Sequence, residues 1–112
     1  MANKLVSLRR KSDFFSLQNN GKRCSSTRWM LLVFKENGLD HSRFGWTIPK
    51  KVGSSVIRNR LKRWLRDYFR SKTFNKSIDL NVVIRANEKN FFKTIEHNDF
   101  ISALDRASDK VF

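Results

Sequence analysis

The segment KKVGSSVIRNRLKRWLRDYFR, residues 50–70, determines how the rest of the chain is interpreted. It carries eight Lys and Arg residues and a single acid, Asp67. At about 100° per residue, a helix here has one apolar side. That side carries Ile57, Leu61, Trp64, Leu65 and Tyr68. The remaining surface is cationic and carries Arg58, Arg60, Lys62, Arg63, Arg66 and Arg70. A helix from Ser54 or Ser55 would therefore pack on a core and present a broad positive surface.

The cationic surface favours a polyanionic partner over a simple solvated face. Like charges four residues apart destabilise a helix, and acids do not alternate with bases here as they do on helices covered by surface ion pairs. Arg outnumbers Lys, and the planar guanidinium binds phosphate through paired hydrogen bonds. We therefore expect nucleic-acid binding. An anionic membrane surface fits less well, because the apolar side of the helix is needed for the core.

Composition indicates one globular domain, residues 1–112, with its positive charge concentrated in the first part of the chain. The net charge is +14; residues 1–70 hold 17 Lys and Arg against 4 acids, and residues 71–112 hold 7 against 6. Cys24 is the single cysteine, so no intramolecular disulfide can form and a reducing, cytoplasmic compartment is expected. No apolar run reaches membrane-spanning length, and no secretory signal is recognisable.

The remaining pattern predicts an α+β sandwich with one sheet, in the order αββαβα. A first helix capped by Ser12 or Asp13 ends at Asn20, and a last helix runs from Asn98 to Asp109. Strands are expected at 28–35, 43–49 and 79–86, the first two paired as an antiparallel hairpin. Residues 86–97 are expected to form a loop with an exposed Phe91-Phe92 pair.

The two faces of the predicted strands differ in side-chain size. In 43–49, Phe44, Trp46 and Ile48 share one face and Gly45 and Thr47 share the other, which indicates a core on one side and a shallow groove on the other. Strand 28–35 is apolar on both faces, which is typical of full burial. The alternative is that one of its faces lines an open groove.

Catalytic and metal-binding patterns are missing from the sequence. His41 and His97 fall in predicted loops, and no nucleophile with a base, no Cys/His ligand set and no paired carboxylates stand out. The basic part of the chain has almost none of the acids that a two-metal nuclease requires. We therefore predict no catalytic residue and no metal site on this chain.

The basic segment closely resembles the signature of the bacterial ribonuclease P protein family. The matching pattern is Lys50-Lys51-x-Gly53-x-x-Val56-x-Arg58-Asn59-Arg60-x-Lys62-Arg63-x-x-Arg66. Leu8 to Gly21 resembles the first helix of that family, with Phe14 at its aromatic position, and Asp79 to Arg85 resembles its last strand. The resemblance covers nearly the whole chain.

The resemblance implies a single-domain α/β sandwich with a central mixed sheet and a left-handed βαβ crossover, as in one ribosomal protein fold. Such crossovers are otherwise right-handed in about 98% of cases. It also implies an RNA-binding subunit of a ribonucleoprotein endoribonuclease, whose catalytic RNA uses Mg²⁺ to remove the 5′ leader of precursor tRNA. The expected partners are the catalytic RNA and precursor tRNA, not a membrane, and the protein alone would bind no cofactor.

Two sets of site residues follow from the resemblance. The basic-helix RNA site comprises Lys50, Lys51, Arg58, Asn59, Arg60, Lys62, Arg63 and Arg66. The leader cleft is lined by Phe14, Met30 and Leu32, with Thr47 opposite. Two positions depart from the family pattern. Gln18 replaces a second aromatic residue that would stack on the leader, and Ile84 replaces a small Ala, which would narrow the cleft.

Two other functions remain open at this stage. One is a ribosomal-type RNA-binding protein with no role in tRNA processing, which would rely on the same positive surface. The other is a stand-alone RNA-cleaving enzyme, against which the missing acid and base residues count.

Overall fold

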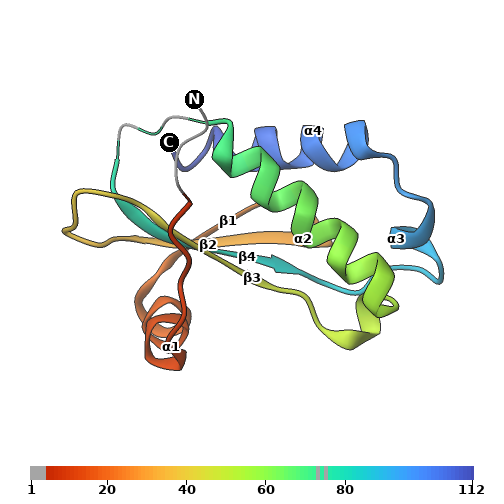
Figure 1. The fold of residues 1–112 in the computed structure, drawn as a ribbon, viewed down its shortest axis with the longest axis horizontal. Helices are drawn as coiled ribbons and strands as arrows, with labels where there is room; N and C mark the ends of the chain where they lie inside the picture. Colours follow the sequence, from red (N-terminus) through yellow and green to blue (C-terminus); the bar gives the residue numbers. More distant parts are fainter. Residues whose placement is uncertain (1–4, 73, 75) are drawn as a thin grey trace.

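The computed structural model describes residues 5–72, 74 and 76–112, which form an α+β fold built on one mixed sheet (Figure 1). The strands are β1 (Lys22–Thr27), β2 (Met30–Glu36), β3 (Arg43–Thr47) and β4 (Ile78–Ile84). The helices are α1 (Lys11–Asn20), α2 (Ser55–Arg70), α3 (Phe91–Thr94) and α4 (His97–Ser108), with a 3-10 turn, η1 (Lys50–Val52), before α2. The predicted fold class is confirmed.

Strand β4 lies inside the sheet, whose order is β1-β2-β4-β3. It pairs antiparallel with β2 and parallel with β3. The predicted hairpin between the first two expected strands is therefore wrong, because β4 separates β2 from β3. The antiparallel partner of β2 is instead β1, a strand that the sequence did not predict because KRCSST carries few strand-forming residues.

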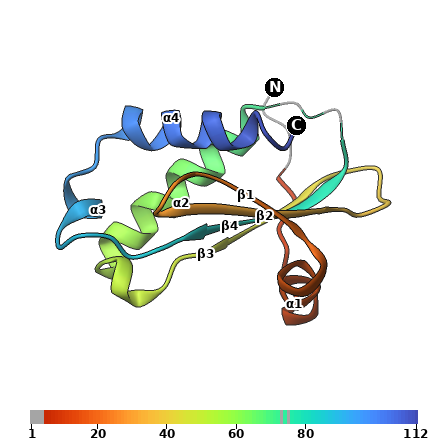
Figure 2. The same cartoon turned by 180° about the vertical axis from the view of Figure 1, so that it is seen from behind.

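The connection from β3 through α2 to β4 joins two parallel strands and is left-handed, as the two opposite views show (Figures 1 and 2). It places α2 on the same side of the sheet as α4, whereas α1 lies on the other side. The edge of β3 is partly covered by the segment before α1, whose Leu8 amide donates to the Phe44 carbonyl at 2.7 Å.

The main core fills the space between the sheet and the α2–α4 layer. It includes Leu61, Leu65 and Phe69 of α2, Phe100 and Leu104 of α4, and Leu80, Val82 and Ile84 of β4, all at most 2% exposed. The predicted exposed Phe91-Phe92 pair is wrong. Phe92 is 1% exposed, and its ring packs edge-on against Trp29 at a centroid distance of 5.7 Å.

Helix starts were predicted with mixed success. Ser54 caps α2, its hydroxyl accepting from the Ile57 amide at 3.3 Å. The caps predicted for α1 and α4 are wrong, since α1 follows Arg10 and α4 follows Glu96 without a side-chain cap. Both helices begin one or two residues earlier than the polar residues that suggested their caps.

Replacing Phe69 with Ala should test the position of the main core. Its ring is 2% exposed and lies against Phe44 at a centroid distance of 4.8 Å. The substitution should lower the free energy of unfolding by about 3–5 kcal/mol, as for other buried aromatic truncations. Urea denaturation measures this loss. Phe15→Ala is the matched control, because that ring is 65% exposed, and its effect should stay within about 0.5 kcal/mol. Equal losses would contradict the described core.

Candidate nucleic-acid interface

Helix α2 separates its apolar and cationic residues onto opposite sides, as the sequence predicted. Leu61, Leu65 and Tyr68 are buried against the sheet, and Ile57 and Trp64 are partly buried beside them. Asn59, Arg63, Arg66 and Arg70 are exposed, as are Lys50 and Lys51 of η1. In the ranges that the structure describes, none of these cations lies within salt-bridge distance of a carboxylate.

Two of the predicted basic residues also have partners inside the fold. Arg58 is partly buried, and its Nε donates to the Gly53 carbonyl at 3.2 Å, which closes the turn before α2. Arg60 points to α3, where its guanidinium donates to the carbonyls of Phe92 and Lys93. Lys62 is partly buried at the border of the cationic side.

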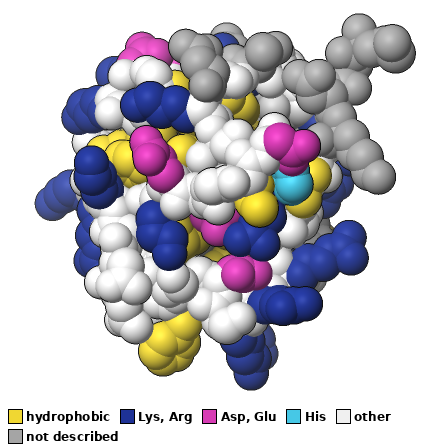
Figure 3. Space-filling view, turned by 90° about the vertical axis from the view of Figure 1, so that its left-hand side faces the viewer, with side chains coloured by type: hydrophobic (Ala, Val, Ile, Leu, Met, Phe, Trp, Pro, Cys, Tyr) yellow, Lys and Arg dark blue, Asp and Glu magenta, His cyan; other side chains and the backbone are white. Residues whose placement is uncertain are grey.

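Positive charge also extends beyond α2. Figure 3 shows the end of the molecule at the left of Figure 1, where Lys and Arg side chains are distributed over the surface and acidic side chains are fewer. A chain with this charge attracts polyanions, and the attraction weakens as salt is added.

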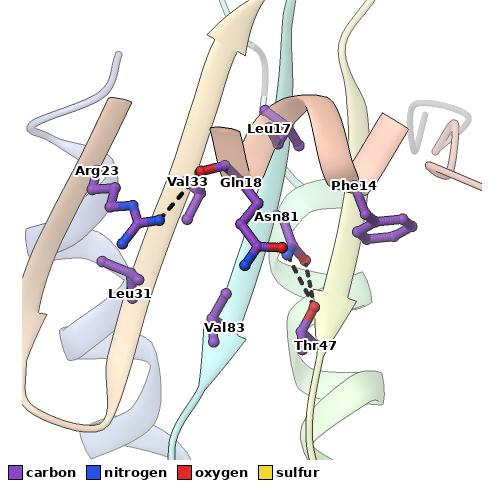
Figure 4. Close-up of a pocket in the computed structure, with 9 residues that line it drawn as sticks. All are labelled: Phe14, Leu17, Gln18, Arg23, Leu31, Val33, Thr47, Asn81 and Val83. Carbon is purple, nitrogen blue, oxygen red and sulfur yellow. Dashed lines mark hydrogen bonds between the residues drawn. The ribbon is translucent and has the colours of Figure 1, made fainter. Parts of the chain in front are cut away.

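A groove lies on the opposite side of the sheet, between α1 and strands β2, β4 and β3 (Figure 4). Its volume is about 300 Å³. It is lined by Phe14, Leu17, Gln18, Arg23, Leu31, Val33, Thr47, Asn81 and Val83. The apolar side chains of Leu31, Val33 and Val83 form much of its floor, and the Asn81 amide donates to the Thr47 hydroxyl at 2.9 Å.

Phe14 forms a wall of this groove because Gly45 leaves room for its ring. A Cβ at position 45 would lie 2.6 Å from Cε1 of Phe14, so a larger residue would displace the ring. Thr47 lies on the same face of β3, two residues beyond Gly45, so it shares the β3 edge of the groove with Phe14, whereas Leu31 and Arg23 lie at the other edge. Phe14 and Thr47 therefore both line the groove, but Thr47 does not lie opposite Phe14 as expected.

Met30 and Leu32 do not line the groove, and the sequence assignment of that face was wrong. They are 1% and 0% exposed in the main core, on the side of α2 and α4. Because side chains alternate along a strand, Leu31 and Val33 face the groove instead. The faces are assigned by the register of the sheet. Val83 pairs with both Leu31 and Thr47, which puts all three side chains on one face.

The two residues that depart from the family pattern, Gln18 and Ile84, lie on opposite faces of the sheet. Gln18 lines the groove, at the position suggested for an aromatic residue. Ile84 pairs with Met30 and is fully buried in the core, so it does not narrow the groove as expected. Val83, its neighbour, is the β4 side chain that forms part of the groove floor.

An ion-pair network connects the sheet to α1 at one end of the groove. Arg43 donates to both carboxylate oxygens of Asp79, at 2.8 and 2.6 Å, and its guanidinium lies 3.6 Å from the Asp13 carboxylate of α1. Asn37 also donates to Asp79 at 3.0 Å. Burial alone would raise the pKa of Asp79, but these hydrogen bonds outweigh burial and hold that pKa below its ordinary value.

This pKa shift predicts how stability depends on pH. A carboxylate with a lowered folded-state pKa stabilises the fold above its unfolded value, about 3.9, and loses that contribution as pH falls through the folded value. The difference in unfolding free energy between the parent and Asp79→Asn should therefore be constant above about pH 5 and shrink below about pH 3.9. Denaturant titrations across this range measure it. Glu88→Gln, at an exposed position, should show no such trend, and a pH-independent Asp79 effect would rule out this role.

The part of the chain that the structure describes offers no group of three or more His, Cys, Asp or Glu side chains able to hold a metal ion. Within the same residues, no helix has the length and apolar character needed to cross a bilayer. The functional features are those of an α+β protein with a cationic helix over one face of its sheet and a groove on the other.

Comparisons with known proteins place this fold in a family. The chain matches the Ribonuclease P family over residues 2–110. It is 36% identical to a ribonuclease P protein component of Syntrophomonas wolfei, over 96% of this chain and 91% of that protein. It is 31% identical to one of Thermotoga petrophila, over 88% and 89% respectively.

Solved structures agree with this assignment. The ribonuclease P protein of Thermotoga maritima superposes with a TM-score of 0.78 at 29% identity, covering 89% of this chain and 92% of that one. A Staphylococcus aureus ribonuclease P protein superposes with a TM-score of 0.82 at 23% identity, covering 96% of both chains, which supports the fold alone. The chain belongs to the ribonuclease P protein family. This membership implies a role in tRNA processing, as the protein component of an endoribonuclease complex.

Proposed function

We propose that this protein binds the catalytic RNA of ribonuclease P through η1 and the cationic side of α2, and holds the 5′ leader of precursor tRNA in the groove beside α1. The RNA would supply the chemistry with Mg²⁺, and the protein would supply binding and orientation without a cofactor of its own. The observation that carries this proposal is a helix with one buried apolar side and one cationic side, whose basic residues have no carboxylate partner among the described residues.

Repulsion among the basic residues of α2 lowers the stability of this helix when no anion is bound. Basic residues repeat at positions 58, 62, 66 and 70, and each like-charged pair four residues apart destabilises a helix by about 0.2–0.5 kcal/mol. A phosphate backbone would remove this repulsion and release counterions, which favours binding. The proposed contacts are Lys50, Lys51, Arg58, Asn59, Lys62, Arg63 and Arg66.

The groove suits a single strand of variable sequence. Leu31, Val33 and Val83 offer contact to any base, and the Phe14 ring offers a surface for stacking, which is also sequence-tolerant. Arg23 at the rim supplies a cation for the backbone. A double-stranded segment would not fit a groove of about 300 Å³, so an unpaired leader is the favoured occupant.

We also propose a cytoplasmic location, where the RNA partner and precursor tRNA would be found. The lone Cys24 is compatible with a reducing compartment.

The experiment that tests this function compares cleavage of precursor tRNA by the catalytic RNA with and without the protein, over a range of Mg²⁺ concentrations. The protein should lower the Mg²⁺ concentration needed for cleavage at the 5′ end. A ribosomal-type RNA-binding protein would leave that concentration unchanged. Cleavage by the protein without added RNA would instead indicate a stand-alone nuclease.

The double substitution Arg63→Ala with Arg66→Ala should weaken binding to the catalytic RNA without unfolding the protein. Both side chains are exposed, and neither has a carboxylate partner in the part of the chain that the structure describes. Losing two phosphate contacts should reduce the slope of log K against log salt by about 1.4 to 1.8. Filter binding at several salt concentrations measures the slope. The control is Lys89→Ala with Arg106→Ala, two exposed cations outside α2. An equal reduction in the control would mean that α2 has no special role.

Phe14→Ala should weaken the binding of precursor tRNA to the assembled ribonucleoprotein. Loss of one stacked base corresponds to about 1–3 kcal/mol, or about 5- to 150-fold in the dissociation constant. Mature tRNA, which lacks the leader, should bind as before. Phe15→Ala is the matched control, since this neighbouring ring lies outside the groove. Equal losses for precursor and mature tRNA would show that Phe14 supports the fold and not the leader.

A further inference from the structure

Arg60 differs from the other basic residues of α2, since its guanidinium is turned into the fold. We propose that Arg60 is a positioning residue that ties α2 to α3, and that it makes no phosphate contact although it stands within the Arg-Asn-Arg motif. This proposal rests on the function proposed for α2. Its two neighbours on the outer surface, Asn59 and Arg63, would make the contacts that Arg60 does not.

The carbonyls that Arg60 binds have no other donor among the described residues. One terminal nitrogen of Arg60 donates to the Phe92 carbonyl and lies 3.4 Å from the Lys93 carbonyl. Both carbonyls belong to the last turn of α3, where a helix leaves its carbonyl groups unsatisfied. A cation at the carboxyl end of a helix is also favoured by the helix dipole. Arg60 therefore satisfies carbonyl groups at the carboxyl end of α3.

The guanidinium also packs against a side chain of α2 itself. Its Cζ lies 5.0 Å from the centre of the Trp64 ring, one turn further along α2, in the arrangement of a cation–π contact. Its Nε is buried with no hydrogen-bond partner. A nitrogen without access to water cannot reach a phosphate, so a paired contact that uses Nε is not available at this residue, and one terminal nitrogen is already occupied by α3.

The position of α3 matters because it carries the aromatic residues that close the main core near the start of α2. Phe92 is fully buried against Trp29, and Trp29 in turn stacks on Phe100 of α4 at a centroid distance of 5.8 Å. Arg60 thus links the first half of α2 to the cluster that joins α3, α4 and the turn between β1 and β2. Releasing this link would loosen α3 and change the orientation of the exposed residues beside Arg60.

Two sets of variants in the full-length protein separate positioning from RNA contact. Arg60→Ala and Arg60→Lys remove the paired donation to α3, and the second keeps the positive charge. Arg63→Ala is the matched control, because Arg63 lies three residues further along α2 and is exposed. Two quantities are measured. One is the salt dependence of binding to the catalytic RNA. The other is amide hydrogen exchange at Thr94 and Ile95, which donate to the carbonyls of Asn90, the residue before α3, and Phe91.

Both Arg60 variants should accelerate exchange at Thr94 and Ile95 by about tenfold or more, as expected when charge-assisted hydrogen bonds to a local structure are lost. Retaining the charge in Arg60→Lys should not restore protection. Affinity for the RNA should fall, but the slope of log K against log salt should not change. Arg63→Ala should reduce that slope by about 0.7–0.9 and leave the exchange of α3 unaltered.

The proposal is overturned if Arg60→Ala reduces the salt slope as Arg63→Ala does, or if exchange at α3 stays at the parent rate in Arg60→Lys. If Arg60→Ala fails to fold, Arg60→Lys decides by the same exchange measurement. An unchanged slope for Arg63→Ala would instead remove the RNA site proposed for α2, and the exchange result would still establish or refute the link between Arg60 and α3.

Discussion

Strand β4 is the element on which the other parts of this structure depend, because it is paired on both edges and covered on both faces. Its side chains alternate without a break. Ile78, Leu80, Val82 and Ile84 face the α2–α4 layer, whereas Asp79, Asn81 and Val83 face α1. A shift of one residue in its register would bury Asp79 and Asn81 in the core, at a cost of several kcal/mol, so the register is strongly fixed.

The left-handed crossover follows from the same arrangement. Given the order β2-β4-β3 and the directions of the strands, the hand of the β3–α2–β4 connection decides which face α2 covers. A right-handed connection, the usual choice, would put α2 over Asn81 and Val83 and occupy the groove. The observed hand pairs the apolar side of α2 with the apolar side of β4. It also leaves the mixed face to α1, a short helix that covers the sheet only partly.

The sequence predicted those features that depend on a single element. The two sides of α2 come from helical periodicity alone, and the large and small faces of β3 from alternation alone, so both were found. The features that were missed depend on distant partners. Met30 and Leu32 could not be distinguished from Leu31 and Val33, because all four are apolar and only pairing with β4 assigns them to faces. The sequence suggests exposure for Arg60 and Phe92, because it does not show the contact between them, which joins residues 32 positions apart.

One wall of the groove is formed by α1, a helix that is not stable by itself. Helix α1 has 10 residues, too few for a stable helix on its own, so its position depends on tertiary contacts. These are the buried Leu17, the fit of Phe14 over Gly45, the Lys35 ammonium donating to Ser16 at 2.7 Å, and Arg43 between Asp79 and Asp13. Phe14 therefore helps to hold the helix whose wall it forms. A bound strand that moves this ring would compete with the packing of α1, which couples occupancy of the groove to the order of α1.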